Sequence, residues 1–259
     1  MPLQNKTAIV TGAGSGLGRA GALALARAGA AVLASDLNEA AARATVDAIS
    51  QQGGRAWAFG ADAGSAADAE RMVRAAVDAF GALHILYNNA GIAIPFEDGF
   101  TPAIEPEVWD RVIRVNLSSV FYCSKYAIPE IAKAGGGSII NTASSMAHLP
   151  LGGLDGYAAS KGGVALLTKS MAAGCGPLNI RVNAISPGYV DTPMNALIFG
   201  NEQLKEGFAK GHATGLQSPE EIAELVVFLA SDASRSLTGA VLNCDRGWTA
   251  FKQPEMLRG

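Results

Sequence analysis

The chain has 259 residues, of which 49% are hydrophobic and 17% charged, which is typical of a globular protein with a sizeable core. Its net charge of -3 gives no general attraction to nucleic acid or anionic membranes, and no apolar run reaches the roughly eighteen residues that span a bilayer. The N-terminus lacks a signal-peptide pattern, and the three cysteines, far apart and without metal-ligand spacing, indicate reduced thiols in a cytoplasmic protein without a metal site.

Short apolar runs alternate with helical patterns along the whole chain. The runs that predict buried strands lie at residues 7–10, 31–34, 56–59, 85–87, 138–141, 180–185 and 240–243. Ala-rich helical patterns lie between them, for example at residues 17–28 and 66–79. Continuous apolar strands separated by helices favour a parallel sheet that is covered on both faces. We therefore expect an α/β fold, a Rossmann-type doubly wound parallel sheet of about seven strands with helices on both faces.

Two later segments carry local signals. Ser218-Pro219-Glu220-Glu221 offers an N-cap serine, a proline at the first helical position and a glutamate three residues after the cap, so a helix begins there. Residues 190–215 follow a late strand and show no strand pattern, and we expect a long irregular insertion that serves as a lid. No repeat or linker divides the chain, so residues 1–259 are expected to form one domain.

A glycine-rich turn from Thr11 to Gly18 joins the first strand to the first helix. Glycines let the backbone approach a pyrophosphate, and the helix N-terminus supplies amide donors and a favourable dipole. The alternative is a glycine-rich turn without a ligand. The position between strand and helix favours a nucleotide site.

Two carboxylates follow the next strands. Asp36 ends the second strand, where such folds place a carboxylate on the adenosine ribose hydroxyls, although it could also be an ordinary N-cap. A carboxylate there repels a 2′-phosphate, and neither Ser15 nor Leu37 supplies a cation, so we expect NAD and not NADP. Asp62, just after the third strand, could accept a hydrogen bond from the adenine amino group or could cap its own helix.

Tyr157 and Lys161 lie four residues apart on a predicted helix and therefore share one face. There the ammonium would favour the phenolate and lower the pKa of the phenol from about 10. Such a phenol can move a proton on or off an alcohol or ketone oxygen. By itself the pair also fits a surface tyrosine beside a solvated lysine.

Together with Asn88-Asn89-Ala90-Gly91 after the fourth strand and Pro187-Gly188 after the sixth, these motifs resemble the short-chain dehydrogenase/reductase family in its compact single-domain branch. The resemblance runs from about residue 6 to residue 248. It implies an NAD-binding catalytic domain over residues 1–259, with a substrate lid at about 190–215. The implied activity is NAD-dependent interconversion of a secondary alcohol and a ketone.

The resemblance implies a catalytic set of Asn116, Ser144, Tyr157 and Lys161. Tyr157 would be the acid/base, and Ser144 would hydrogen-bond the reacting oxygen. Lys161 would lower the pKa of Tyr157 and bind the nicotinamide ribose. Asn116 would hold a water that connects Lys161 to solvent, although alone it also fits an amide on a helix surface. Ser145 competes for the serine role, and the spacing from Tyr157 favours Ser144.

The resemblance also implies which residues hold NAD. Besides Tyr157 and Lys161 they are Gly12, Ser15, Gly16, Leu17, Gly18, Asp36, Leu37, Asp62, Ala63, Asn89, Ala90, Gly91, Pro187, Gly188, Val190 and Thr192. Thr192 would lie near the nicotinamide carboxamide, and Asn89 would support the adenine side.

Substrate contacts are expected from Ser144, Met146, Leu154, Tyr157 and Tyr189. Further residues expected near the pocket are apolar: Ala93, Ile94, Leu149, Met194, Leu197 and Ile198. With no arginine to grip a carboxylate or phosphate, they predict a neutral, moderately hydrophobic substrate, unless they only pack the lid.

Two other functions remain open. A sugar or polyol dehydrogenase would need polar pocket groups such as His148, Asn195 or Glu97. A non-catalytic NAD-binding sensor is the alternative from another class, and the complete set of four catalytic residues argues against it.

The family's subunit contacts imply a homotetramer, with a small-molecule substrate and no nucleic-acid or membrane partner. Its helices at about 107–134 and from Tyr157 onward usually pair with a second subunit, through residues such as Val120, Phe121, Ala127, Leu166, Leu167 and Met171. The chain departs from the family pattern at Asp245-Arg246-Gly247, where an arginine must leave a usually compact turn. Residues 211–215 also lack the basic residue often found before the next helix.

Overall fold

The computed structural model describes residues 1–250. Its parallel sheet has seven strands in the order β3-β2-β1-β4-β5-β6-β7. The strands are β1 (Thr7–Thr11), β2 (Ala31–Asp36), β3 (Ala56–Gly60), β4 (Ile85–Asn88), β5 (Gly137–Thr142), β6 (Ile180–Pro187) and β7 (Val241–Cys244). The strand order reverses between β1 and β4, where open α/β sheets bind ligands at the carboxyl ends of their strands. The expected fold class is confirmed.

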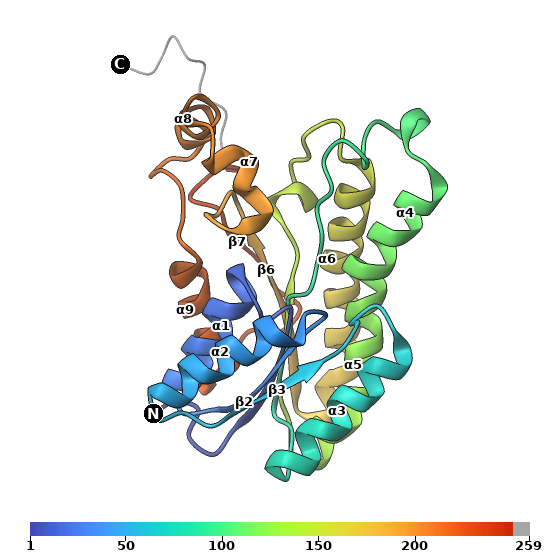
Figure 1. Ribbon diagram of the computed structural model, residues 1–259. Helices are drawn as coiled ribbons and strands as arrows, with labels where there is room; N and C mark the ends of the chain where they lie inside the picture. Colours follow the sequence, from blue (N-terminus) through green and yellow to red (C-terminus); the bar gives the residue numbers. More distant parts are fainter. Residues whose placement is uncertain (251–259) are drawn as a thin grey trace.

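Helices cover both faces of the sheet (Figure 1). One face carries α1 (Gly16–Arg27), α2 (Glu39–Gln51) and α9 (Pro219–Ala230). The other carries α3 (Ala66–Phe80), α5 (Ser119–Lys133) and α6 (Asp155–Cys175), with α4 (Pro106–Ile113) continuing into α5 through a π-helical turn at Arg114–Ser118. Single 3-10 turns lie at Thr101–Ala103, Ser145–Ala147, Gly176–Leu178, Pro193–Asn195 and Asp232–Ser234.

Small residues let α1 lie close to the sheet. Ala22 and Ala24 are buried, and a Cβ atom on Gly21 would lie 2.7 Å from the ring of Tyr87 in β4. Tyr87 is itself fully buried, so the ring cannot retreat from a larger neighbour. Close packing at this helix places the glycine turn that precedes it directly over the strand ends.

The two edge strands differ from the expectation of fully buried strands. Trp57 in β3 is 58% exposed, and β7 is only partly buried. Both strands have a neighbour on one side only, so their side chains meet solvent at the edge. The five central strands carry the buried apolar character that the sequence predicts.

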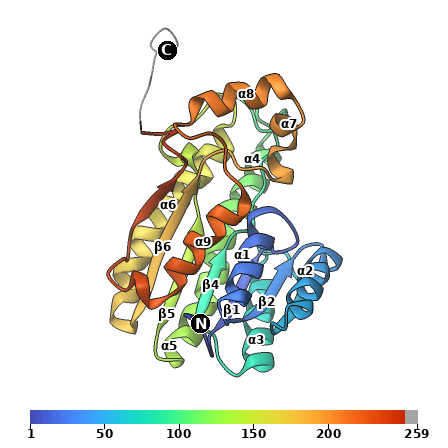
Figure 2. The ribbon, with the colours of Figure 1, turned by 90° about the vertical axis from the view of Figure 1, so that its left-hand side faces the viewer.

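Residues 190–215 are not irregular, contrary to expectation. They contain α7 (Ala196–Phe199) and α8 (Glu202–Gly211), which lie beyond the carboxyl ends of the strands (Figure 2). The Asn201 side chain caps α8 by accepting the Leu204 amide at 3.0 Å. The predicted helix start at Ser218 is confirmed by a complete capping box with Glu221.

Candidate active site

A cavity of about 570 Å³ follows the carboxyl ends of the strands, from Asp36 at the end of β2 to Tyr189 beyond β6. It is lined by every residue predicted to hold the cofactor except Gly18, and by Ser144, Tyr157 and Lys161 from the predicted catalytic set. Of the predicted substrate residues, Met146, Leu154 and Tyr189 also line it. Gly18 and Asn116 lie outside this lining.

The glycine turn forms a cradle that only glycine can build. Gly12 and Gly16 have φ angles of 65° and 50°, in the left-handed region that side chains disfavour. A Cβ atom on Gly18 would lie 2.0 Å from the carbonyl oxygen of Gly12. Gly18 therefore lets α1 start against the turn and does not itself face the cavity. This cradle fits the approach of a pyrophosphate to the start of α1.

Asp36 connects the glycine turn to the loop after β2. Its Oδ2 accepts the Gly14 amide and its Oδ1 accepts the Asn38 amide, each at 2.9 Å. Asn38, and not Asp36, is the N-cap of α2, so the alternative role of Asp36 is wrong. The carboxylate thus lines the cavity beside the glycine turn.

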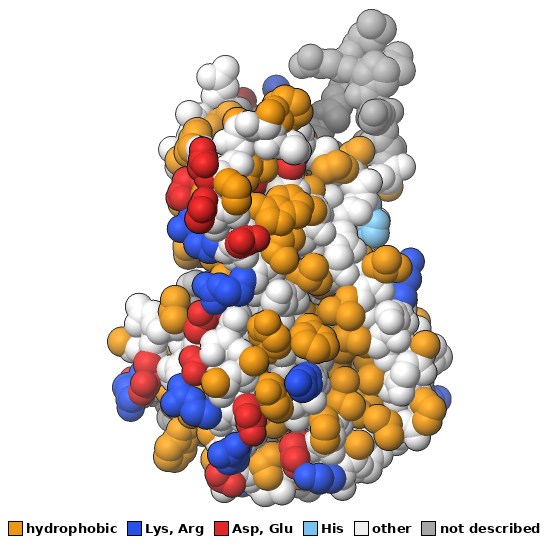
Figure 3. All heavy atoms as spheres, turned by 90° about the vertical axis from the view of Figure 1, so that its right-hand side faces the viewer, with side chains coloured by type: hydrophobic (Ala, Val, Ile, Leu, Met, Phe, Trp, Pro, Cys, Tyr) orange, Lys and Arg blue, Asp and Glu red, His pale blue; other side chains and the backbone are white. Residues whose placement is uncertain are grey.

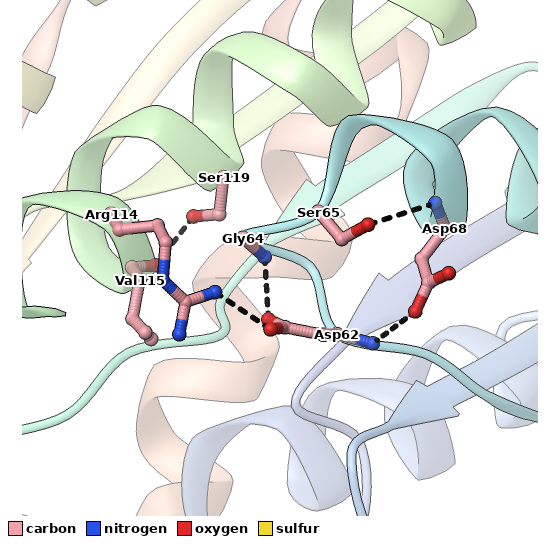
Figure 4. Close-up of polar contacts among 7 residues, drawn as sticks. All are labelled: Asp62, Gly64, Ser65, Asp68, Arg114, Val115 and Ser119. Carbon is pink, nitrogen blue, oxygen red and sulfur yellow. Dashed lines mark hydrogen bonds and ion pairs between the residues drawn. The ribbon is translucent and has the colours of Figure 1, made fainter.

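Asp62 is paired with an arginine that the sequence analysis missed (Figure 4). Its Oδ2 lies 2.6 Å from Nη1 of Arg114, and its Oδ1 accepts the Gly64 amide at 2.8 Å. Ser65 caps α3, so Asp62 is not the cap of its helix. The pair joins the loop after β3 to the π-helical turn, and both side chains line the cavity.

Asn116 lies in the π-helical turn and is fully buried, so it is not an amide on a helix surface. Its Oδ1 accepts the Ile92 amide at 2.7 Å, and its Nδ2 donates to the Ile92 carbonyl at 2.9 Å and to Ser160 Oγ at 3.1 Å. Asn116 thus joins the loop after β4 to α6. π-helical turns are rare and often occur at functional sites, and this one contains the buried Asn116.

Tyr157 and Lys161 share one face of α6, and neither is a solvated surface residue. Nζ of Lys161 lies 5.6 Å from the centroid of the Tyr157 ring and donates to the Thr142 carbonyl at 2.8 Å. Lys161 is 3% exposed, and burial lowers its pKa to about 8. The pair is therefore enclosed at the end of β5.

The pKa of Tyr157 differs from the expectation. Burial raises it, because the phenolate loses solvation, and a hydrogen bond with Ser144 acts in the opposite direction. Lys161 lies over the face of the ring. The expected lowering of the Tyr157 pKa by Lys161 is thus wrong for this structure, since desolvation outweighs the other effects.

Ser144 is the serine that contacts Tyr157. It follows β5, is buried, and accepts the Met146 amide at 3.1 Å while bonding with the Tyr157 side chain. Ser145 also lines the cavity, but only Ser144 acts to lower the pKa of Tyr157. The assignment of Ser144 as the catalytic serine stays a prediction.

Asp98, in the loop between β4 and α4, is a second residue that the sequence analysis missed. It is buried, and its oxygens accept the Gly156 amide at 2.9 Å and the Tyr157 amide at 2.8 Å. No local sequence signal distinguishes it, because its partners lie 58 and 59 residues later. Asp98 holds the first turn of α6, which carries Tyr157.

The other end of the cavity is mainly apolar. Apolar and aromatic side chains here include Ala93, Met194, Leu197 and Ile198, as predicted, and also Leu151 and Phe208. The expected Ile94 and Leu149 do not line it.

The polar groups that a polyol would need are engaged elsewhere. His148 bonds to Ser186 Oγ at 3.2 Å, and Glu97 pairs with Arg111 at 2.5 Å. Asn195 lines the cavity, but its amide donates to the Val190 carbonyl at 2.8 Å.

Arg246 leaves its turn toward the start of α9. It has a φ angle of 46°, donates to the Thr214 carbonyl at 2.5 Å and pairs with Glu221. Its Nη1 lies 3.9 Å from where a Cβ atom of Gly215 would be. Arg246 thus places a guanidinium beside residues 211–215, which contain no Lys or Arg of their own.

Among residues 1–250, no helix is long and apolar enough to cross a membrane. The same residues contain no group of three or more His, Cys, Asp or Glu side chains that could hold a metal ion.

The fold and cavity define a dinucleotide-binding α/β protein. A family model described as enoyl-(acyl carrier protein) reductase matches residues 12–249. The chain is 42% identical over 247 residues to the cyclohexanol dehydrogenase of Acinetobacter sp. (strain SE19), covering 95% of this chain and 96% of that protein. It is 40% identical over 251 residues to the cis-4-hydroxycyclohexanecarboxylate dehydrogenase of Sinomonas cyclohexanicum, covering 95% and 97%.

A third relative is the 2,5-dichloro-2,5-cyclohexadiene-1,4-diol dehydrogenase of Sphingobium indicum, 38% identical over 247 residues that cover 95% of this chain and 97% of that protein. The chain belongs to the short-chain dehydrogenase/reductase family. It is therefore an oxidoreductase that acts on CH–OH groups with a nicotinamide cofactor.

Proposed function

We propose that the protein is an NAD-dependent dehydrogenase that interconverts a neutral, moderately hydrophobic secondary alcohol and its ketone, with Tyr157 as the acid/base. The observation that carries the proposal is one cavity, with the carboxylate of Asp36 at one end and Ser144, Tyr157 and Lys161 toward the other. We further propose that residues 1–259 act as one catalytic domain in the cytoplasm, with residues 190–215 as the lid.

Charge supports NAD over NADP. Among the described residues that line the cavity, the cations are Arg114 and Lys161. Arg114 is paired with Asp62, and Lys161 lies beside Tyr157. A 2′-phosphate beside Asp36 would therefore meet a carboxylate without a free cation.

The proton chemistry follows from the surroundings of Tyr157. A bound nicotinamide would accept or supply the hydride. With its pKa raised by burial, Tyr157 holds its proton at neutral pH and can donate it to a ketone oxygen. In the oxidative direction Tyr157 must first release its own proton to solvent, and the phenolate then accepts the alcohol proton. The Lys161 ammonium, 5.6 Å from the ring centroid, offsets part of the cost that burial places on this phenolate. Ser144 hydrogen-bonds the same substrate oxygen and keeps it beside the phenol.

The substrate class follows from the apolar end of the cavity. Its walls offer aromatic and aliphatic side chains and no arginine to bind an anion, apart from the paired Arg114. Three relatives are named for a cyclic alcohol, a cyclic diol and a cyclic hydroxycarboxylate, which favours an alicyclic substrate. The engaged positions of His148, Glu97 and Asn195 count against the polyol alternative.

The test is turnover of purified protein with NAD or NADP and a panel of cyclohexanol, cyclopentanol, 2-butanol, sorbitol and xylitol, followed by absorbance of the reduced cofactor. We expect oxidation of cyclohexanol with NAD, and loss of turnover by about 10³-fold in Tyr157→Phe, which removes the acid/base. Equal turnover by Tyr157→Phe would exclude the mechanism. NADH binding without turnover of any alcohol would favour the sensor.

We propose a homotetramer that uses the face formed by α4, α5 and α6, which Figure 3 shows with many hydrophobic side chains. Trp109, Phe121 and Leu166 are exposed there, Leu166 at 70%. Val120 and Ala127, by contrast, are buried in the core and cannot serve such a surface. Light scattering after size exclusion should give four chains for the wild type and fewer for Leu166→Glu.

A further inference from the structure

An aromatic cluster closes the apolar end of the cavity. Its members come from three segments: Tyr189 after β6, Phe208 and His212 at the end of α8, and Trp248 after β7. Ring centroids lie 4.2 Å apart for Tyr189 and Phe208, 5.1 Å for Tyr189 and Trp248, and 4.9 Å for His212 and Trp248. Tyr189 and Phe208 line the cavity, whereas His212 and Trp248 lie behind them.

His212 makes two polar contacts that determine its tautomer. It is 5% exposed, and its Nδ1 lies 2.7 Å from the Phe208 carbonyl oxygen. Because a carbonyl only accepts, Nδ1 carries the proton. Nε2 is then free to accept the Tyr189 amide, at 3.4 Å. Both contacts together require a neutral ring, and burial lowers the His212 pKa in the same direction.

Two glycines make room for this cluster. A Cβ atom on Gly188 would lie 2.8 Å from Nε2 of His212, and one on Gly211 would lie 2.1 Å from the Trp248 ring. Either side chain would force the rings apart. No residue of α8 is buried, and its last turns pack against the rest of the chain through Phe208, which contacts Tyr189 and Trp248.

We propose that His212 is a positioning residue that sets substrate affinity. Its neutral ring ties the end of α8 to the backbone of Tyr189, and so holds the rings of Tyr189 and Phe208 as a wall against the ring of a cyclic alcohol. This inference rests on the proposed function and names cyclic alcohols as the substrates that use this wall.

Two substitutions separate the two contacts of His212. In His212→Gln the side-chain amide reaches the position of Nε2 and can accept the Tyr189 amide. In His212→Asn it reaches only the position of Nδ1 and can donate to Phe208. We expect His212→Gln to keep the KM for cyclohexanol within about twofold, and His212→Asn to raise it about fivefold or more, the effect of one lost hydrogen bond.

Separate measurement of KM and kcat distinguishes a positioning role of His212 from a general loss of structure. In His212→Asn, kcat and the Kd for NADH should stay within about twofold of wild type, and the KM for 2-butanol should change less than that for cyclohexanol, because the smaller alcohol covers less of the wall. The proposal would be overturned by an unchanged KM for cyclohexanol in His212→Asn, or by an equal rise of this KM in both variants. A change in the Kd for NADH would also overturn it.

Trp248 gives a readout that does not depend on turnover. Its Nε1 is buried and has no hydrogen-bond partner among the described residues. In a Trp57→Phe/Trp109→Phe background, Trp248 emission should shift to the red in His212→Asn and not in His212→Gln, because water reaches the loosened ring. If no alcohol were oxidised but the red shift were still seen in His212→Asn, only the proposed function would be contradicted. If the Trp248 emission spectra of His212→Asn and His212→Gln were identical, the role of His212 would be contradicted.

Discussion

The carboxylate of Asp98 accepts the backbone amide of Tyr157 at 2.8 Å, so a residue of the loop after β4 holds the residue proposed to move the proton. The Gly156 amide bonds the other oxygen at 2.9 Å, and a Cβ atom on Gly156 would lie 3.0 Å from it. A negative charge at the start of α6 also complements the helix dipole.

Asp98→Ala should therefore destabilise the fold by about 1–2 kcal/mol, as loss of a helix cap does, and should lower kcat because Tyr157 loses its fixed position. Urea unfolding and steady-state kinetics measure the two effects. Asp110→Ala, which removes an exposed carboxylate from α4, is the matched control and should change neither. Wild-type kcat in Asp98→Ala would show that Tyr157 is held by other contacts.

Lys161→Met should stabilise the protein at pH 7. The shift in the Lys161 pKa from 10.5 to about 8 corresponds to about 3 kcal/mol of unfavourable charge burial. Loss of the bond to the Thr142 carbonyl reduces the expected gain to roughly 1–3 kcal/mol. Turnover should fall sharply in the same variant.

The stability gain of Lys161→Met over wild type should decrease as pH rises. Between about pH 8 and 10.5 the unfolded chain binds the Lys161 proton and the folded chain does not, so wild-type stability gains from this residue as pH rises. The difference between Lys161→Met and wild type should accordingly narrow from pH 7 to pH 10. Lys169→Met, exposed on the same helix, should show no such trend. A constant difference across this range would contradict the lowered pKa.

Asp36→Asn should relax the preference for NAD. The amide keeps an oxygen for the Gly14 or Asn38 amide but no longer repels a 2′-phosphate, so the ratio of kcat/KM for NADP to that for NAD should rise about tenfold. Kinetics with both cofactors measure this ratio. Asp47→Asn, on the exposed side of α2, should leave it unchanged. An unaltered ratio in Asp36→Asn would remove the charge argument for NAD.

Arg246 combines an unfavourable backbone with favourable contacts. Arg246→Gly relieves the left-handed φ angle of 46° while losing the contacts to Thr214 and Glu221, whereas Arg246→Ala loses the contacts and keeps the strain. The glycine variant should be more stable than the alanine variant by about 1 kcal/mol. Thermal unfolding of the two variants tests this, and equal stability would mean that the turn relaxes without glycine.

The sheet was predictable because its central strands are continuous apolar runs, a pattern that few other buried elements share. The α7–α8 segment was missed because α8 has no buried face, and the cap at Asn201 is its clearest local signal. The cavity lining was likewise predictable from motifs at strand ends, because parallel strands bring their carboxyl ends to one edge.

Spacing in the sequence places side chains on a common face but does not give their burial. This is why the adjacency of Tyr157 and Lys161 was predicted while the direction of the Tyr157 pKa was not. Asp98 and Arg114 acquire their roles only from partners more than fifty residues away. His212 and Trp248 likewise acquire their roles from contacts outside their own segments, with Tyr189 lying 23 residues before His212.

The position of Trp248 behind the aromatic wall orders events during synthesis. Every described residue that lines the cavity, from Thr11 to Phe208, is translated before Trp248. The lining of the cavity is therefore synthesised before the ring that supports its apolar end. A chain that ends just before Trp248 would keep all of the described lining and lose the ring that packs against Tyr189.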